Sequence, residues 1–144
     1  MQQVYPKQPS PCHCLNVRRA SRAVSQFYEG YLEPCGLTIP QLSLLLQLST
    51  AERTTINELA ERMRIDRTTL NRNMKPLADA GLITIRPGRD FRTRHIQLTK
   101  AGGEAVSQGR KRWREAQGAL TEYLGEDDLK KLTALMSKLE ALVP

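Results

Sequence analysis

Two cysteines and a histidine lie side by side near the N-terminus, in the segment SPCHCLNVRR at residues 10–19. Cys12, His13 and Cys14 are residue types that can bind a metal, and a thiol can also act as a redox switch or remain an inert small side chain. The third cysteine, Cys35, lies further along the chain. Which of these roles applies depends on the element that holds the thiols.

A long basic stretch occupies the middle of the chain. Residues 62–114 contain 14 Lys or Arg and 4 Asp or Glu, a balance of +10, whereas the other residues contain 8 and 11, a balance of −3. This asymmetry favours a polyanionic partner for the centre and a different role for the ends. A solvated surface with chance clustering would have the same composition, so the elements within the stretch decide between the two.

Length and composition indicate one globular domain. The chain has 144 residues, of which 40% are hydrophobic and 26% charged, and this length can bury a real core. No apolar run approaches the roughly 18 residues that span a bilayer, and the first residues lack the apolar centre of a signal peptide. We therefore expect a cytoplasmic protein without membrane contact, whose three cysteines do not form a disulfide scaffold.

Helices are expected on both sides of the basic stretch. Ser10 as N-cap and Pro11 in the first turn predict a helix over residues 11–32, which Pro34 and Gly36 end. An almost wholly apolar helix follows over IPQLSLLLQLS, and a long one is expected over residues 100–124. The final helix carries an apolar stripe made of Leu129, Leu132, Leu135, Met136, Leu139 and Leu142.

The centre of the chain predicts a helix-turn-helix followed by a β-hairpin. Thr55 starts the helix INELAERMR, the link RI follows, and Asp66 caps RTTLNRNMKPLADAG. LITIRP and TRHIQLT alternate in polarity around the turn residues GRD, which indicates two strands with a basic tip. This order predicts a mainly α fold with a small β-hairpin wing, a winged helix-turn-helix whose second helix lies in the major groove of DNA.

The outer side of that second helix carries side chains that can read or grip DNA. Arg can hold a guanine with two hydrogen bonds, Thr and Asn can bond base edges, and Lys suits phosphate. The candidates on this helix are Arg67, Thr68, Thr69, Asn71, Arg72 and Lys75. An ordinary solvated face would carry similar residues, but the hairpin and the local charge favour DNA contact.

The hairpin tip, RPGRDFRTR, sets arginines around one acid. An arginine on such a tip can enter the minor groove, where the potential is most negative. We expect Asp90 to orient Arg92 through a carboxylate–guanidinium pair. The candidate wing contacts are Arg89, Asp90, Arg92 and Arg94.

The segments INELAERMRIDRTTLNRNMKPLADAGLI and RPGRDFRTRHIQLTKAGGEA, with two helices before them and two after, resemble a MarR-type transcriptional regulator. The resemblance covers about residues 12–143. Its most specific parts are LADAGLI before the wing, the Asp-x-Arg of Asp90 and Arg92 within it, and LTKAG after it. It implies a homodimeric repressor on a pseudo-palindromic operator, released by a small molecule or by oxidation.

The charge pattern agrees with such a dimer on double-stranded DNA. We expect residues 1–144 to form one domain, with dimerisation helices at 11–33 and 100–143 and a winged helix-turn-helix lobe at 38–99. The first and last helices carry apolar stripes that one small domain cannot cover, and half-sites roughly 10 bp apart require a two-fold partner. The ends then mediate self-association while the basic centre meets DNA.

The helix expected from Pro11 bears on the thiols. It turns Cys12 and Cys14 about 200° apart, which opposes a shared metal or a disulfide between them, although a later helix start weakens this objection. Cys14 lies in the positive first turn, one turn before Arg18, and both features favour a reactive thiolate. Cys35 is roughly 30 Å away along the helix, so it can bond only a partner subunit's thiol. Inert thiols and a redox sensor both remain open.

The first helix also resembles that of the OhrR peroxide-sensing branch of the family. Cys14 matches the sensing cysteine, Ser21 and Arg22 match a Ser-Arg pair seven residues later, and Tyr28 matches one of two tyrosines. Ile39 stands where the second tyrosine is expected, and the long fifth helix has no resolving cysteine. For a small-molecule inducer, the family geometry implies a pocket at Arg22 and Tyr28. The redox candidates are Cys14, Cys12 and Cys35.

Other classes of function fit the sequence less well. It has no phosphate-cradling glycine loop and no His-Glu-x-x-His pattern, so we expect no enzyme, no metal and no cofactor. His95 on a wing strand is interpreted as a solvated or DNA-proximal residue rather than a base. Aromatic residues make up only 5% and form no stacking platform for RNA. The remaining alternative is an architectural, nucleoid-type protein that binds duplex DNA without sequence preference.

Overall fold

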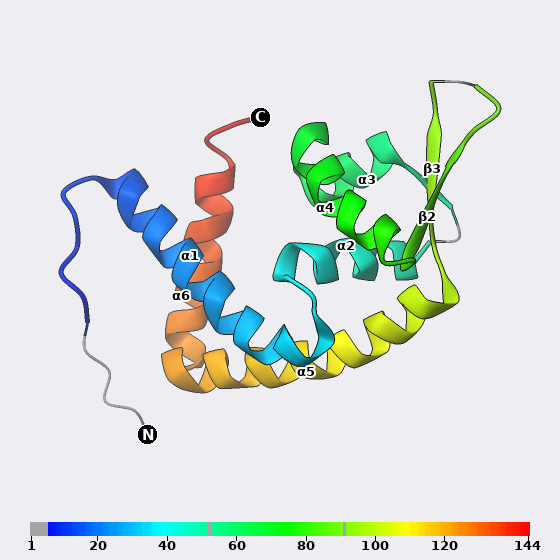
Figure 1. The fold of residues 1–144 in the computed structure, drawn as a ribbon. Coiled ribbons are helices and arrows are strands. Elements are labelled where there is room, and N and C mark those ends of the chain that lie inside the picture. The colour runs from blue at the N-terminus through cyan, green and yellow to red at the C-terminus, as the bar shows by residue number, and fades with distance from the viewer. Residues whose placement is uncertain (1–5, 52, 91) are drawn as a thin grey trace.

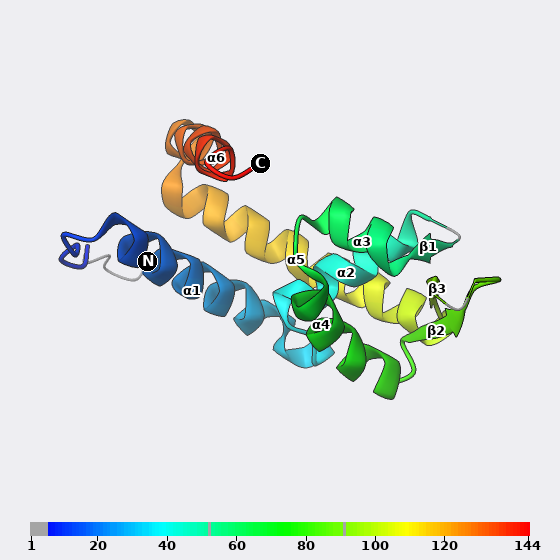
Figure 2. The same ribbon diagram turned by 90° about the horizontal axis from the view of Figure 1, so that it is seen from above.

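The computed structural model describes residues 6–51, 53–90 and 92–144. Figure 1 shows a long helix, α5, running along the base of the molecule, with α1 and α6 over one half of it. A lobe made of α2, α3, α4 and a small sheet lies over the other half. Figure 2 shows, from above, that α6 stands apart from α1. The mainly α fold with a β wing is therefore confirmed.

The chain begins with α1 (His13–Leu32), a short 3-10 turn η1 (Glu33–Cys35) and α2 (Ile39–Ser49). Thr38 caps α2, because its hydroxyl accepts the N–H of Gln41 at 3.3 Å while the Gln41 side chain accepts the Thr38 N–H at 3.1 Å. This reciprocal cap satisfies two backbone donors that the first turn of the helix leaves open. It fixes the start of the most buried helix of the lobe.

The start of α1 is later than predicted. The expected first residue was Pro11, but Cys12 is the N-cap, with an extended backbone at φ −85° and ψ 113°. Ser10 does not cap the helix with its side chain. Its backbone N–H and carbonyl instead each form a 2.8 Å hydrogen bond with the side-chain amide of Asn16. These bonds tie the preceding segment against the first turn, so the chain stays extended through Cys12.

The helix-turn-helix consists of α3 (Ile56–Met63) and α4 (Arg67–Asp79), in agreement with the prediction. A two-residue strand, β1 (Thr54–Thr55), precedes α3 and was not predicted. It pairs antiparallel with β3, about forty residues further along the chain. A strand of two residues is too short to show an alternation of polar and apolar residues in the sequence. It forms because β3 offers backbone hydrogen bonds.

The wing consists of β2 (Ile83–Pro87) and β3 (Arg94–Leu98), and the sheet order is β1-β3-β2. Both pairings are antiparallel, so β3 is the central strand. Ile83 and Ile96 are buried on the face of the sheet that meets the helices. Since side chains alternate along a strand, the opposite face carries the polar residues of β2 and β3.

The long helix α5 (Lys100–Leu124) leaves the wing directly, and α6 (Glu126–Glu140) follows Gly125. A Cβ atom at Gly102, in the first turn of α5, would lie 2.1 Å from the carbonyl oxygen of Leu82. Only glycine therefore allows α5 to start this close to the wing. Within the described ranges, no helix has the length and apolar character needed to cross a membrane.

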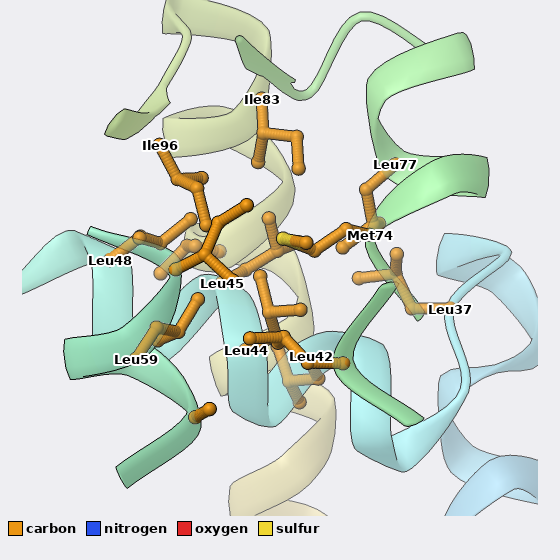
Figure 3. Close-up of a cluster of buried hydrophobic side chains, with 14 of the residues drawn as sticks. Leu37, Leu42, Leu44, Leu45, Leu48, Leu59, Met74, Leu77, Ile83 and Ile96 are labelled. Atoms are coloured by element: carbon orange, nitrogen blue, oxygen red, sulfur yellow. The ribbon is translucent and has the colours of Figure 1, made fainter. Parts of the chain in front are cut away.

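The core lies between α2 and the elements that surround it (Figure 3). Its centre is a set of leucines from α2, and side chains from α3, α4 and the inner face of the sheet pack around them. Burying each such side chain contributes about 1.5–3 kcal/mol, so this cluster holds the two helices and the wing in one fixed arrangement. The largest fully buried side chains are Leu32, Leu42, Leu44, Leu45, Leu59, Leu70, Met74, Leu77 and Ile96.

Candidate nucleic-acid interface

The first helix of the pair, α3, is fixed at both ends. The Thr55 hydroxyl accepts the N–H of Glu58 at 3.1 Å, and the Glu58 carboxylate accepts the Thr55 N–H at 3.3 Å. At the other end Arg64 adopts a left-handed conformation, with φ 54°, and its N–H donates to the Ala60 and Glu61 carbonyls. This left-handed residue closes α3 and turns the chain toward α4.

The second helix, α4, begins at an aspartate cap. The backbone N–H of Thr69 donates to the Asp66 carboxylate at 2.7 Å. Hydrogen bonds from Thr69, with a smaller contribution from the charge of Arg72, hold the pKa of Asp66 below its usual value. The carboxylate therefore stays charged at the positive N-terminus of α4, where a negative charge stabilises the helix.

Helix α4 divides into an apolar face and a polar face. Leu70, Met74 and Leu77 are buried in the core. Of the predicted contact residues on this helix, Thr69 is half-buried and the others are exposed. Pro76 is also exposed and interrupts the helical hydrogen bonds, and nothing in the structure explains it. The exposed candidates are Arg67, Thr68, Asn71, Arg72 and Lys75.

Asp90 shapes the wing turn through backbone hydrogen bonds. Its carboxylate accepts the N–H of Arg92 at 3.2 Å, and its carbonyl accepts the N–H of Thr93 at 3.0 Å. The predicted carboxylate–guanidinium pair with Arg92 is wrong, because the ion pairs of the described residues lie elsewhere. The carboxylate is turned toward its own backbone, as in an Asx turn, so it positions Arg92 through the main chain.

Among the residues that the structure describes, the cations of α4 and the wing form no salt bridge. The ion pairs within the described part of the chain are Arg64–Glu140, whose side chains are largely exposed, and Arg112–Glu115, whose side chains are a little under half exposed. In Figure 1, α4 and the wing tip lie on the side of the lobe opposite α5. One side of the lobe therefore offers unpaired positive charge to a polyanion. Its exposed cations are Arg67, Arg72, Lys75, Arg89, Arg92 and Arg94.

Comparisons with known proteins agree with this geometry. The MarR family model matches residues 36–92, which contain α2, the helix pair and the first wing strand, β2. The Mycobacterium tuberculosis transcriptional regulator MosR, solved in complex with DNA, is 34% identical with a TM-score of 0.79, and the match covers 92% of this chain and 99% of that one. This chain belongs to the MarR family.

Curated relatives of this MarR protein are also regulators. An uncharacterised HTH-type transcriptional regulator from Bacillus cereus is 28% identical over 125 residues, which cover 86% of this chain and 84% of that protein. The organic hydroperoxide resistance transcriptional regulator of Bacillus subtilis is 32% identical over 90 residues, 62% of this chain and 61% of that protein. The MarR chain is thus a transcriptional regulator and not an enzyme, as predicted.

The thiols of this MarR protein lie at the two ends of α1. Cys12 and Cys14 are exposed, and Cys35 is half-buried in η1. Because Cys12 precedes the helix and has an extended backbone, helical geometry does not hold its sulfur about 200° away from that of Cys14. No group of three or more His, Cys, Asp or Glu side chains placed to hold a metal occurs among the described residues.

The structure does not bring Arg22 and Tyr28 together on one face of α1. Tyr28 is buried, its hydroxyl donates to the side chain of Gln117 on α5, and burial raises its pKa. Arg22 is exposed, and six residues along a helix place it about 120° around the axis from Tyr28. Within one protomer, Tyr28 connects α1 to α5.

One group of polar residues at the three-stranded sheet was not predicted from the sequence. Arg53, Arg86 and His95 lie together on the outer face of the sheet, away from the core. The alternation of LITIRP indicated which residues share that face of β2. The register between β2 and β3 and the place of Arg53 beside them are seen only in the structure. Arg53 and Arg86 were not among the predicted DNA contacts, and His95 was interpreted as a solvated or DNA-proximal residue.

Proposed function

We propose that this MarR protein is a sequence-specific, DNA-binding repressor that acts as a homodimer on a pseudo-palindromic operator, with residues 1–144 forming one domain. The observation that carries the proposal is the exposed polar face of α4 beside the basic wing tip. Arginine and asparagine on that face suit base edges in the major groove, and the wing arginines suit the minor groove. The likeness to MosR in complex with DNA supports it.

The unpartnered surface of α6 supports the homodimer. No residue of α6 is buried, and its residues Leu135 and Leu139 are 58% and 46% exposed. Val24 and Phe27 of α1 are about 40% exposed on the same half of the molecule (Figure 2). Extended apolar surfaces of this kind mark protein–protein interfaces. A second copy of the chain covers them, and its two-fold axis sets two α4 helices at half-sites about one DNA turn apart.

Operator selection tests this proposal. A duplex library with a random centre is selected on the purified protein, and the enriched site is compared with a shuffled duplex at fixed salt, since salt controls the non-specific affinity. We expect a palindrome bound roughly 10³-fold or more tightly than the shuffled duplex, with two protomers per site by light scattering. Equal affinity for all duplexes would contradict the proposal and favour the architectural alternative.

We also propose that a chemical signal releases the repressor, through thiol oxidation or a small ligand. Cys14 is exposed in the first turn of α1. α1 packs on α5, to which Tyr28 links it, and α5 begins directly after the wing strand β3. A change at the start of α1 is thus connected by packed elements to the DNA-binding lobe. The 32% identity to the B. subtilis organic hydroperoxide resistance regulator supports the oxidative route.

An organic hydroperoxide tests the oxidative route. The Cys14 thiolate attacks the peroxide, the O–O bond breaks, the thiol becomes a sulfenic acid, and the peroxide is reduced to its alcohol. We expect the peroxide to release operator DNA from wild type and from Cys35→Ser but not from Cys14→Ser. Mass spectrometry of the oxidised protein shows whether Cys12 then forms a disulfide. Equal release from Cys14→Ser contradicts this route and leaves the ligand route.

A further inference from the structure

We propose that the outer face of the wing sheet is a binding site for an oxyanion of the phosphate class. A cavity of about 150 Å³ opens on this face. A water molecule takes up about 30 Å³, so the cavity has room for a five-atom oxyanion together with water. The residues that line it are Arg53, Thr84, Arg86, Pro87, His95 and Gln97.

The register of the sheet assembles this site. Arg86 on β2 lies directly opposite His95 on β3, and Thr84 lies opposite Gln97. The alternating residues between them belong to the core face, where Ile96 is buried. Arg53 comes from the other flank of β3, just before β1. The two guanidinium groups therefore approach the central strand from both sides.

The chemistry of the lining is that of an anion site. Two guanidinium groups, an imidazole, a hydroxyl and an amide meet there, and no carboxylate lines the cavity in the described part of the chain. Arg53 and Arg86 take part in neither of the ion pairs found among these residues. Such a surplus of donors and positive charge is stabilised when an anion accepts from several of them at once.

His95 contributes the imidazole of this lining. Its Nδ1 atom is buried and has no hydrogen-bond partner, in the part of the molecule that the structure describes. Gly88 makes room for the ring, because a Cβ atom there would lie 2.8 Å from His95 Nε2. The backbone is thus shaped to hold this imidazole at the cavity.

Two sources can present a phosphate group to this pocket. One is the operator, since the pocket lies on the same two strands that carry the wing tip to DNA. The other is a small phosphate ion in solution. The statement that operator DNA supplies the phosphate rests on the proposed function. The existence of the anion site does not rest on it. A phosphodiester of the DNA flanking the wing fits the position best, because β2 and β3 continue from the cavity into the tip.

The first arm of the test uses inorganic phosphate and the protein without DNA. The chain has two histidines, so the ring signals of His95 report on the pocket and those of exposed His13 serve as an internal control. We expect added phosphate to shift the His95 ring signals along a saturating binding curve. The His13 ring signals should show no such saturating shift. Arg86→Gln and Arg53→Gln should abolish the response. Lys111→Gln makes the same charge change at an exposed residue of α5, and this variant should keep the response of His95 to phosphate.

The second arm uses the selected operator and identifies the source. If a DNA phosphodiester fills the pocket, Arg86→Gln weakens operator binding and lowers the slope of log affinity against log salt by about one, whereas Lys111→Gln does neither. Unchanged affinity and slope in Arg86→Gln would overturn the DNA source and assign the pocket to a free ion.

The pocket is overturned if phosphate leaves His95 unaffected, or if Arg86→Gln responds as wild type does. Because this readout needs no DNA, its failure is separate from a failure of the proposed function. A wild type that binds no operator but still shows the saturable His95 response contradicts the regulator proposal and supports the pocket.

Discussion

The backbone N–H of Thr69 donates to the Asp66 carboxylate at 2.7 Å, and this bond fixes where α4 begins. Arg67 and Thr68, the first exposed candidates for DNA contact, lie in the turn that it caps. Their placement in a groove therefore depends on a carboxylate that need not touch a base. The cap is local, so its contribution can be separated from that of the contact residues.

Replacing the cap should loosen the start of α4. We expect Asp66→Ala to lower both the melting temperature and the operator affinity, because the Thr69 N–H loses its acceptor. Asp66→Asn keeps an oxygen in the same place and should remain close to wild type at neutral pH. Calorimetry and operator titration on the three proteins test this. Equal losses in Asn and Ala variants would mean that charge, and not the hydrogen bond, does the capping.

The lowered pKa of Asp66 gives this cap a pH dependence with a definite sign. A carboxylate whose pKa is lower in the folded state contributes stability above its unfolded value, roughly 3.9, and loses it as pH falls through the folded value. The difference in melting temperature between wild type and Asp66→Ala should therefore be largest near neutral pH and shrink below about pH 4. A difference that grows in acid contradicts the assigned cause.

Asn71 is exposed on the outer face of α4, where its amide can bond a base edge. We expect Asn71→Ala to relax the sequence preference at one base pair in each half-site. Affinities for a panel of operators with single substitutions measure this. A loss of the same size on every duplex, including the shuffled one, would show that Asn71 contacts the backbone rather than a base.

Arg92 at the wing tip tests the minor-groove contact. We expect Arg92→Ala to weaken operator binding by about 1–3 kcal/mol if the guanidinium makes a specific groove contact. Lys111→Ala on α5 removes a charge of the same sign away from α4 and the wing and serves as the control. Wild-type affinity in Arg92→Ala would remove the wing tip from the mechanism.

Because Asp90 bonds the backbone of Arg92 and not its guanidinium, we expect the Asn and Ala variants at position 90 to differ in operator affinity. The carboxylate oxygen accepts the Arg92 N–H at 3.2 Å, and an asparagine can supply the same acceptor. We expect Asp90→Asn to bind the operator nearly as wild type and Asp90→Ala to bind it less tightly. If both variants lose affinity equally, the negative charge matters and the turn does not.

Leu135 tests the assembly. It is 58% exposed on the apolar side of α6, and a glutamate there would be buried against apolar residues of a second copy. We expect Leu135→Glu to weaken self-association by about 2 kcal/mol or more and to leave the melting of the lobe unchanged. Ser137→Glu adds the same charge toward the opposite side of α6. Light scattering that shows both variants associating as wild type would place the interface elsewhere.

Several features were predictable because their signals are local. Thr38, Thr55, Asp66 and Thr99 each precede a helix, and all four caps form as the residue types indicate. The wing strands follow their own alternation in polarity. The start of α1 is the exception, because the side-chain amide of Asn16 holds the backbone of Ser10 and the helix begins later. The residue types Ser10 and Pro11 favour a helix start, and they could not indicate that Asn16 would bond the Ser10 backbone instead.

The sequence by itself determined the order of the helices and wing strands, the caps of α2 to α5 and the outward face of α4, because these depend on hydrogen bonds and periodicities within a few residues. The tertiary structure alone decided that Asp90 bonds the backbone of Arg92 and that Tyr28 reaches Gln117. It also brought Arg53 to the face of Arg86, because strand pairing joins segments that no local pattern connects. Contacts between distant segments depend on how the core packs, and only the folded chain contains that information.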